Sequence, residues 1–170
     1  MDLKRIERQQ VEIKTLRRML PEGSKVILYD TLKKDSRSRR GVFSGLNSLI
    51  VLYEGEIDDR KQGHYICLIP RPTHIEYFSS LGMSPDHETS ILGLDNKVFK
   101  QLLGKNYKYS RVKLQRDRYD VNDCALWCVA RAYLHKIKLQ DFQKLFLKKV
   151  SLQSTDDRVA YMTYLLQQLQ

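Results

Sequence analysis

A chain of 170 residues lies near the usual size of one domain and can bury a core without disulfides or metal ions. Thirty Lys and Arg residues against twenty Asp and Glu residues give a formal net charge of +10, which favours polyanionic partners. No stretch approaches the roughly 18 consecutive apolar residues of a membrane span, and residues 1–5 begin no apolar secretion signal. We therefore expect a single domain, residues 1–170, that is neither secreted nor in contact with a membrane.

The three cysteines are Cys67, Cys124 and Cys128, and all of them lie in or beside apolar segments. An odd number of cysteines in apolar surroundings argues against a disulfide framework and favours an intracellular, reducing compartment. Because no second pair of metal-binding residues accompanies Cys124 and Cys128, we do not expect a zinc site.

The positive charge is clustered in two stretches. One runs from the N-terminus to Arg40, and the other from Lys97 to Arg118. Clusters of this kind bind polyanions through counterion release, so the binding should weaken steeply with salt. The sequence leaves two interpretations open, contact with DNA and a solvated basic surface.

In the first half of the chain, a helical pattern over residues 3–20 ends at Pro21 and Gly23. A strand is predicted at 25–29 and a basic loop at 33–45. Further strands are predicted at 48–53, 64–69 and 74–79, with an acidic turn at 54–59 between the first two. Three consecutive strands at short spacing favour an antiparallel meander.

In the second half, the pattern predicts a helix at 96–103, a strand at 107–114, a central helix beginning at Cys124 and two helices at 139–150 and 156–169. The fold class is therefore α+β, a small and mainly antiparallel central sheet flanked by helices. We expect an N-terminal helix at 1–20, a core at 26–134 and C-terminal helices at 135–170.

Cys124 is the candidate nucleophile. Asn122 or Asp123 would be a good N-cap, which places Cys124 in the first turn of its helix, where backbone N–H groups and the helix dipole favour a thiolate. Cys128 and Cys67 fit small buried hydrophobic residues instead.

Three motifs accompany this cysteine in a fixed order. They are Gly63-His64-Tyr65, then Tyr77-Phe78-Ser79-Ser80-Leu81-Gly82, then Gln115 followed by Asp123-Cys124-Ala125. In this order they resemble the adenovirus-protease-like and ubiquitin-like-protein protease group of cysteine peptidases, over roughly residues 26–134. The resemblance implies a papain-like, adenain-type fold with the nucleophile at the start of a central helix.

By this resemblance, His64 is the general base for Cys124, and Gln115 donates its amide to the oxyanion. Ser79 stands where the family places the acid that orients the histidine. The third group is then either Ser79 itself or a carboxylate from elsewhere in the chain, since Glu76 should project from the opposite face of its strand.

Two further departures from the family pattern lie close to the nucleophile. Ala125 replaces the glycine that usually follows the cysteine, and its methyl group narrows the approach to the thiol. Gln115 precedes Cys124 by nine positions, so a longer loop must return its amide to the site.

The basic patches and the size of the chain resemble the viral branch of the group, including proteases of virophages and Polinton-like elements. The resemblance implies an endopeptidase that cuts capsid precursor proteins at small-residue, glycine-rich sites during virion maturation, in the virion or at the assembly site. It implies no cofactor, and it allows DNA or a peptide as an activator. Two alternatives stay open: a protease for a ubiquitin-like modifier, and a non-catalytic basic adaptor that binds nucleic acid.

Overall fold

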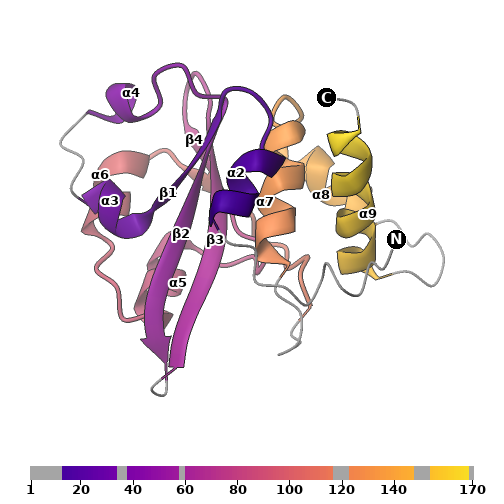
Figure 1. The fold of residues 1–170 in the computed structure, drawn as a ribbon. Helices are drawn as coiled ribbons and strands as arrows, with labels where there is room; N and C mark the ends of the chain where they lie inside the picture. The colour runs from indigo at the N-terminus through magenta and orange to yellow at the C-terminus, as the bar shows by residue number, and fades with distance from the viewer. Residues whose placement is uncertain (1–12, 34–37, 58–59, 117–122, 148–153, 169–170) are drawn as a thin grey trace.

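The fold is built on one five-stranded sheet with helices on both faces (Figure 1). The computed structural model describes residues 13–33, 38–57, 60–116, 123–147 and 154–168, and every structural statement below concerns these residues. The strands, in their order across the sheet, are β1 (Ser24–Leu28), β2 (Ser48–Ile57), β3 (Arg60–Pro70), β4 (Ile75–Phe78) and β5 (Lys108–Tyr109).

The predicted meander is confirmed, because β2, β3 and β4 pair antiparallel in succession. The two outer pairings, β1 with β2 and β4 with β5, are parallel. The sheet is therefore mixed, with most of its residue pairs in the antiparallel pairings. The predicted acidic turn at 54–59 is wrong for residues 54–57, which continue β2 opposite β3, while residues 58–59 lie outside the described part of the chain.

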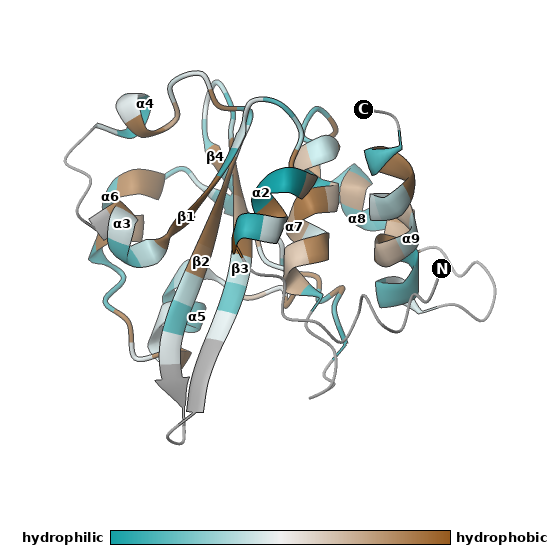
Figure 2. Ribbon diagram, viewed as in Figure 1, coloured by the Kyte–Doolittle hydropathy of each residue, from teal (hydrophilic) through white to brown (hydrophobic). Residues whose placement is uncertain are grey.

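Alternate residues of the strands face two separate cores. On one face, β3 packs against the central helix α7 (Cys124–Tyr133), with α2 (Ile13–Met19), α8 (Leu139–Leu147) and α9 (Thr155–Gln167) around it. On the other face lie α3 (Tyr29–Lys33), α4 (Arg39–Val42) and α6 (Lys97–Leu103). Figure 2 shows the strands apolar where helices cover them, and β2 and β3 more polar toward their hairpin. The α+β class is thus confirmed.

The helices predicted at 96–103 and from Cys124 onward are confirmed by α6 and α7. Those predicted at 139–150 and 156–169 correspond to α8 and α9, and part of each range lies outside the described residues. Of the helix predicted at 3–20, only the described part can be compared, and it contains α2.

Other local predictions also differ from the structure. The strand predicted at 107–114 pairs with β4 only at Lys108 and Tyr109, because β4 itself ends at Phe78. The loop predicted at 33–45 contains the short helix α4, whose N-cap is Ser38. Two further helices were not predicted: α3, which follows β1, and α5 (Pro85–Ile91), which follows β4.

A buried charged group joins β4 to the end of α7. Arg131, whose side chain is fully buried, donates to Glu76 at 2.6 Å, and Arg71 donates to the other carboxylate oxygen at 2.8 Å. Arg71 and Arg131 also donate to the backbone oxygen of Ile137. Glu76 therefore faces α7, as the alternation along the strand predicts, and both oxygens of its carboxylate are held by arginines.

Candidate active site

The candidate nucleophile begins the most buried helix. Asp123 takes the N-cap position of α7, although its side chain makes no capping hydrogen bond, and Cys124 is the first helical residue. The first N–H groups of a helix have no partner within it and favour negative charge nearby. Cys124 is only 2% exposed, so its thiol is shielded from solvent beside these N–H groups.

His64 lies on β3 just beyond the part of that strand that β4 covers. The last residue pair between the two strands joins Cys67 to Phe78, and Ser79 is the first residue after β4. Because β4 ends there, the imidazole of His64 and the hydroxyl of Ser79 approach one another, with 3.2 Å between Nε2 and Oγ.

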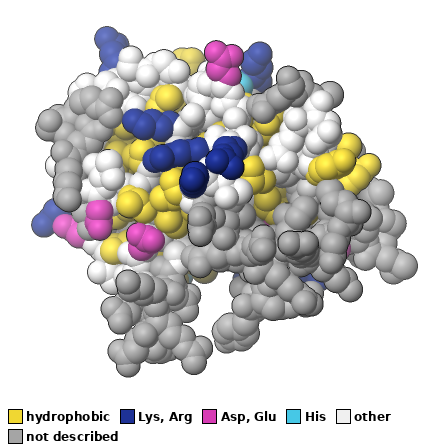
Figure 3. Space-filling model, in the orientation of Figure 1, with side chains coloured by type: hydrophobic (Ala, Val, Ile, Leu, Met, Phe, Trp, Pro, Cys, Tyr) yellow, Lys and Arg dark blue, Asp and Glu magenta, His cyan; other side chains and the backbone are white. Residues whose placement is uncertain are grey.

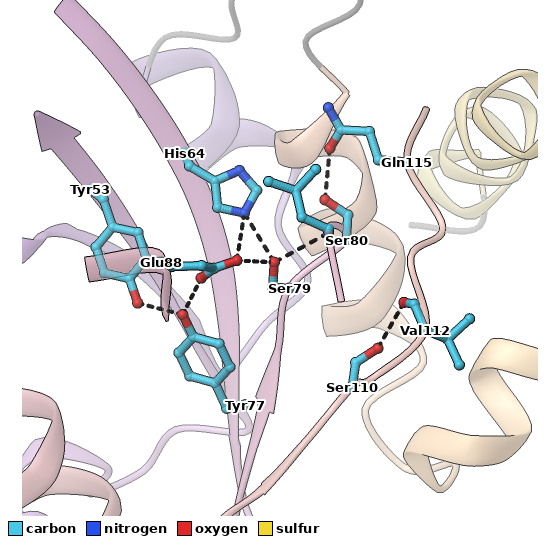
Figure 4. Close-up of polar contacts among 10 residues, drawn as sticks. Tyr53, His64, Tyr77, Ser79, Ser80, Glu88, Ser110, Val112 and Gln115 are labelled. Carbon is cyan, nitrogen blue, oxygen red and sulfur yellow. Dashed lines mark hydrogen bonds and ion pairs between the residues drawn. The ribbon is translucent and has the colours of Figure 1, made fainter. Parts of the chain in front are cut away.

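A chain of hydrogen bonds extends from His64 into the protein (Figure 4). Ser79 donates its hydroxyl hydrogen to Glu88 Oε1, which also lies 3.5 Å from His64 Nε2. Tyr77 donates to the other oxygen of Glu88, and the hydroxyls of Tyr77 and Tyr53 are 2.7 Å apart. Because the Ser79 hydrogen points to Glu88, Ser79 accepts from His64, and Nε2 is the nitrogen that carries a proton.

The surroundings of His64 favour its protonated form. Burial by itself lowers the pKa of the imidazole, but hydrogen bonds with Cys124 and with Glu88, together with the negative charge of both groups, raise it to about 10. Cys124 is thus one of the groups that interact with His64, together with Ser79 and Glu88.

Gln115 is fixed at the same turn through Ser80, the residue after Ser79. The Ser80 hydroxyl donates to Gln115 Oε1 at 2.7 Å, and the backbone N–H of Gln115 donates to the Ser80 carbonyl at 3.0 Å. Because the side-chain oxygen of Gln115 is the end held by Ser80, its NH₂ group is the end directed away and available as a donor. Gly82 lets this turn pass close to the Gln115 segment, since a Cβ there would lie 2.7 Å from the backbone nitrogen of Lys113, and its φ is +71°.

Helix α9 holds the segment of Gln115 against α7. Asp156 is buried in the first turn of α9. Its carboxylate accepts from the indole of Trp127 at 3.1 Å and from the backbone N–H of Arg116 at 3.2 Å. Thr155 donates to the carbonyl of Leu114 at 2.6 Å. Trp127 is three residues after Cys124, so these bonds connect the residues flanking Gln115 to the first turn of α7. Residues 117–122, between the two, lie outside the described ranges.

Sequence reasoning missed Glu88, the carboxylate nearest to His64. The sequence analysis assigned no element to its segment, although Ser84 followed by Pro85 is an N-terminal helix signal, and Ser84 does cap α5. Both groups that the sequence left open lie at His64. The Ser79 hydroxyl contacts the imidazole, and the Glu88 carboxylate accepts from Ser79 and lies 3.5 Å from His64 Nε2. The sequence therefore contained a signal for the helix, but no signal that the Glu88 side chain points toward His64.

The other two cysteines are buried, as the sequence predicts. Cys67 and Cys128 are buried free thiols, and burial raises the pKa of Cys67 to about 12.

Among the residues that the structure describes, no group of three or more His, Cys, Asp or Glu side chains is placed to hold a metal ion. Within the same residues, no helix has both the length and the apolar character to cross a membrane.

The two predicted basic stretches lie on different parts of the molecule. Lys14, Arg17 and Arg18 belong to α2 and are exposed, and Figure 3 shows Lys and Arg side chains gathered on the face where α2 and β1 lie. In the second stretch, Lys97 pairs with Asp95 and Lys100 approaches Asp86. Further along it, Lys108 and Arg111 line a groove at the opposite edge of the sheet.

Comparison with known proteins gives a viral relative. No protein-family model matches the chain. The chain is 27% identical over 138 residues to "Uncharacterized protein V9" of Sputnik virophage. The alignment covers 74% of this chain and 77% of that protein. This similarity supports a viral origin. Among solved structures, the central domain of the uncharacterized Lpg1148 protein from Legionella pneumophila aligns over 95% of this chain and 99% of that one, with 12% identity and a TM-score of 0.48.

Proposed function

We propose that the chain is a cysteine endopeptidase of the viral maturation type, with an adenain-type arrangement of its site. The observation that carries the proposal is the position of His64, whose Nε2 is held by Ser79 and Glu88 and whose imidazole interacts with Cys124. A nucleophile, a base and a group that orients the base are the components of acyl transfer to a thiol.

In this mechanism, Cys124 as thiolate attacks the carbonyl carbon of the scissile peptide, and a C–S bond forms. Protonated His64 gives a proton to the leaving amine as the C–N bond breaks, which leaves a thioester on Cys124. Neutral His64 then takes a proton from water, which attacks the thioester, and the C–S bond breaks. The thiolate and the imidazolium are restored.

The oxyanion formed in each step requires donors. The backbone N–H of Cys124, at the start of α7, is one, and the amide NH₂ of Gln115 is the second. Support for Gln115 comes from Ser80, which holds the amide oxygen and so orients the NH₂ group.

Glu88 replaces the missing acid in our proposal. The carboxylate stabilises the imidazolium by its charge at 3.5 Å and by orienting the Ser79 hydroxyl. A neutral hydroxyl alone would stabilise the imidazolium less, so Glu88 explains how a chain with serine at this position retains a strong base.

Two features bear on the substrate. Cys124 is buried and is followed by the buried Ala125, and we propose a substrate with glycine or other small residues beside the scissile bond because these need the least room. The virophage relative supports a viral setting, and we propose a capsid precursor protein as the substrate, cut during assembly. DNA or a peptide as activator belongs to the same proposal.

Labelling with a peptide that ends in glycine and carries a thiol-directed electrophile tests the proposal by intact mass. We expect one label on the wild-type protein, none on Cys124→Ala and much slower labelling of His64→Ala. Cys128→Ala and His74→Ala are the matched controls and should label like the wild type. No selective labelling of the wild type, with or without DNA, would refute the proposal. Cleavage of ubiquitin-like fusions rather than capsid precursors would redirect it to the modifier proteases.

A further inference from the structure

A groove of about 830 Å³ lies at the β5 edge of the sheet, apart from the candidate active site. Its walls come from three places in the chain: the turn after β3, the segment around β5, and the connection from α7 into α8. None of Cys124, His64, Ser79 or Gln115 lines it. The groove is therefore a separate feature of the surface.

The groove is basic on both sides. Lys108 and Arg111 lie on one wall, and Lys136 and Lys138 on the other, all of them exposed. The carboxylate among the lining residues is Glu76, which is already held by Arg71 and Arg131 and so adds little negative potential. The pKa of His74, also in the lining, is lowered by burial and then by the charge of Lys108, as a positive potential requires.

Two aromatic rings accompany these cations. Tyr107 and Tyr109 are half-buried in the lining, with ring centroids 6.2 Å apart and planes tilted by 35°. The Arg111 guanidinium lies 5.3 Å from the centroid of the Tyr109 ring. Aromatic rings beside a track of cations are the arrangement on which successive bases of a single strand stack while their phosphates meet the cations.

We propose that this groove binds a single strand of nucleic acid. Charge complementarity selects a polyanion, and the tyrosines favour bases over the side chains of an acidic peptide. A volume of about 830 Å³ lies in the range of small-ligand clefts, which suits a few unpaired nucleotides, whereas a rigid duplex meets only the rim. The inference does not depend on the proposed protease activity.

Fluorescence anisotropy with a labelled oligonucleotide of about 12 nucleotides tests this inference. Removing three groove cations in Lys108→Ala/Lys136→Ala/Lys138→Ala should weaken binding at least about tenfold. Each lost phosphate contact also reduces the slope of log affinity against log salt by about 0.7, so the triple variant should lose about 2. Tyr107→Leu/Tyr109→Leu should weaken binding by about fivefold or more with the salt slope unchanged.

The charge-matched control is Lys14→Ala/Arg17→Ala/Arg18→Ala, which removes three exposed cations from α2 at the other edge of the sheet. We expect this variant to bind within about twofold of the wild type. Equal losses in the two triple variants would overturn the inference, because binding would then follow net charge alone. Tighter binding of a duplex or of a poly-glutamate peptide than of the single strand would overturn it as well. Circular dichroism of each variant establishes that the fold is retained.

Discussion

Glu88→Gln is the substitution that most directly tests how the site holds its proton. Glutamine keeps the size of the side chain but removes the charge that lies 3.5 Å from His64 Nε2. An opposite charge at this range shifts a pKa by about 1 to 3 units, at about 1.4 kcal/mol for each unit. The pKa of His64, about 10 in the wild type, should therefore fall by about 1 to 3 units.

The measurement is an NMR titration of protein labelled with ¹⁵N in histidine, which reports the protonation of His64 directly. Asp86→Asn is the matched control, since it makes the same change on the exposed side of the same helix and should leave the His64 titration unaltered. An unchanged midpoint in Glu88→Gln would refute the role assigned to Glu88. Adding Ser79→Asp to Glu88→Gln moves the carboxylate to position 79, next to His64, and should restore most of the lost rise in the pKa of His64.

Four further outcomes are expected. Gln115→Ala should lower the rate of acyl transfer about 10²- to 10³-fold, measured with a cleavable peptide, while labelling of the thiol by iodoacetamide changes little. Because folded His64 binds its proton up to about pH 10 and an unfolded histidine only to about pH 6.5, stability should be full below about pH 6.5 and decline as the pH rises to 10. Urea unfolding of wild type and His64→Ala at several pH values checks this. Arg131→Met leaves buried Glu76 with Arg71 alone and should cost about 3 to 5 kcal/mol in urea unfolding. Gly82→Ala forces a positive φ and a contact of 2.7 Å with backbone, so its melting temperature should drop and its thiol labelling slow.

Much of the site's framework was predictable from local sequence. The apolar run after Cys124 predicts a buried helix that begins at the thiol, and the run after His64 predicts a strand. The alternation along 74–79 separates Glu76 from Ser79, and Glu76 does pair with Arg71 and Arg131 on the α7 side. These features depend on side-chain periodicity within one element, which a sequence displays directly.

Glu88 could not be placed in the same way. It lies nine positions after Ser79, on a helix of seven residues that is too short to show a periodic pattern. Its direction toward His64 depends on how α5 packs beside the end of β4, which is a tertiary property. The strand predicted at 107–114 is shorter in the structure for a similar reason. The length of β5 depends on where its neighbour β4 ends, and the residues of 107–114 do not reveal that end.

The bonds of Asp156 and Thr155 have a consequence for the order in which the molecule assembles. They connect α9 to residues 29, 40 and 41 positions earlier, at Trp127, Arg116 and Leu114. Contacts this distant in sequence form late, since the intervening chain must first be ordered. During synthesis, a nascent chain whose residues 154–157 are still inside the ribosome has Cys124 and His64 but lacks the anchor for the segment of Gln115. In the proposed mechanism, Cys124 and His64 would therefore be present before Gln115 is held in place, and the site would be complete only after α9 has docked.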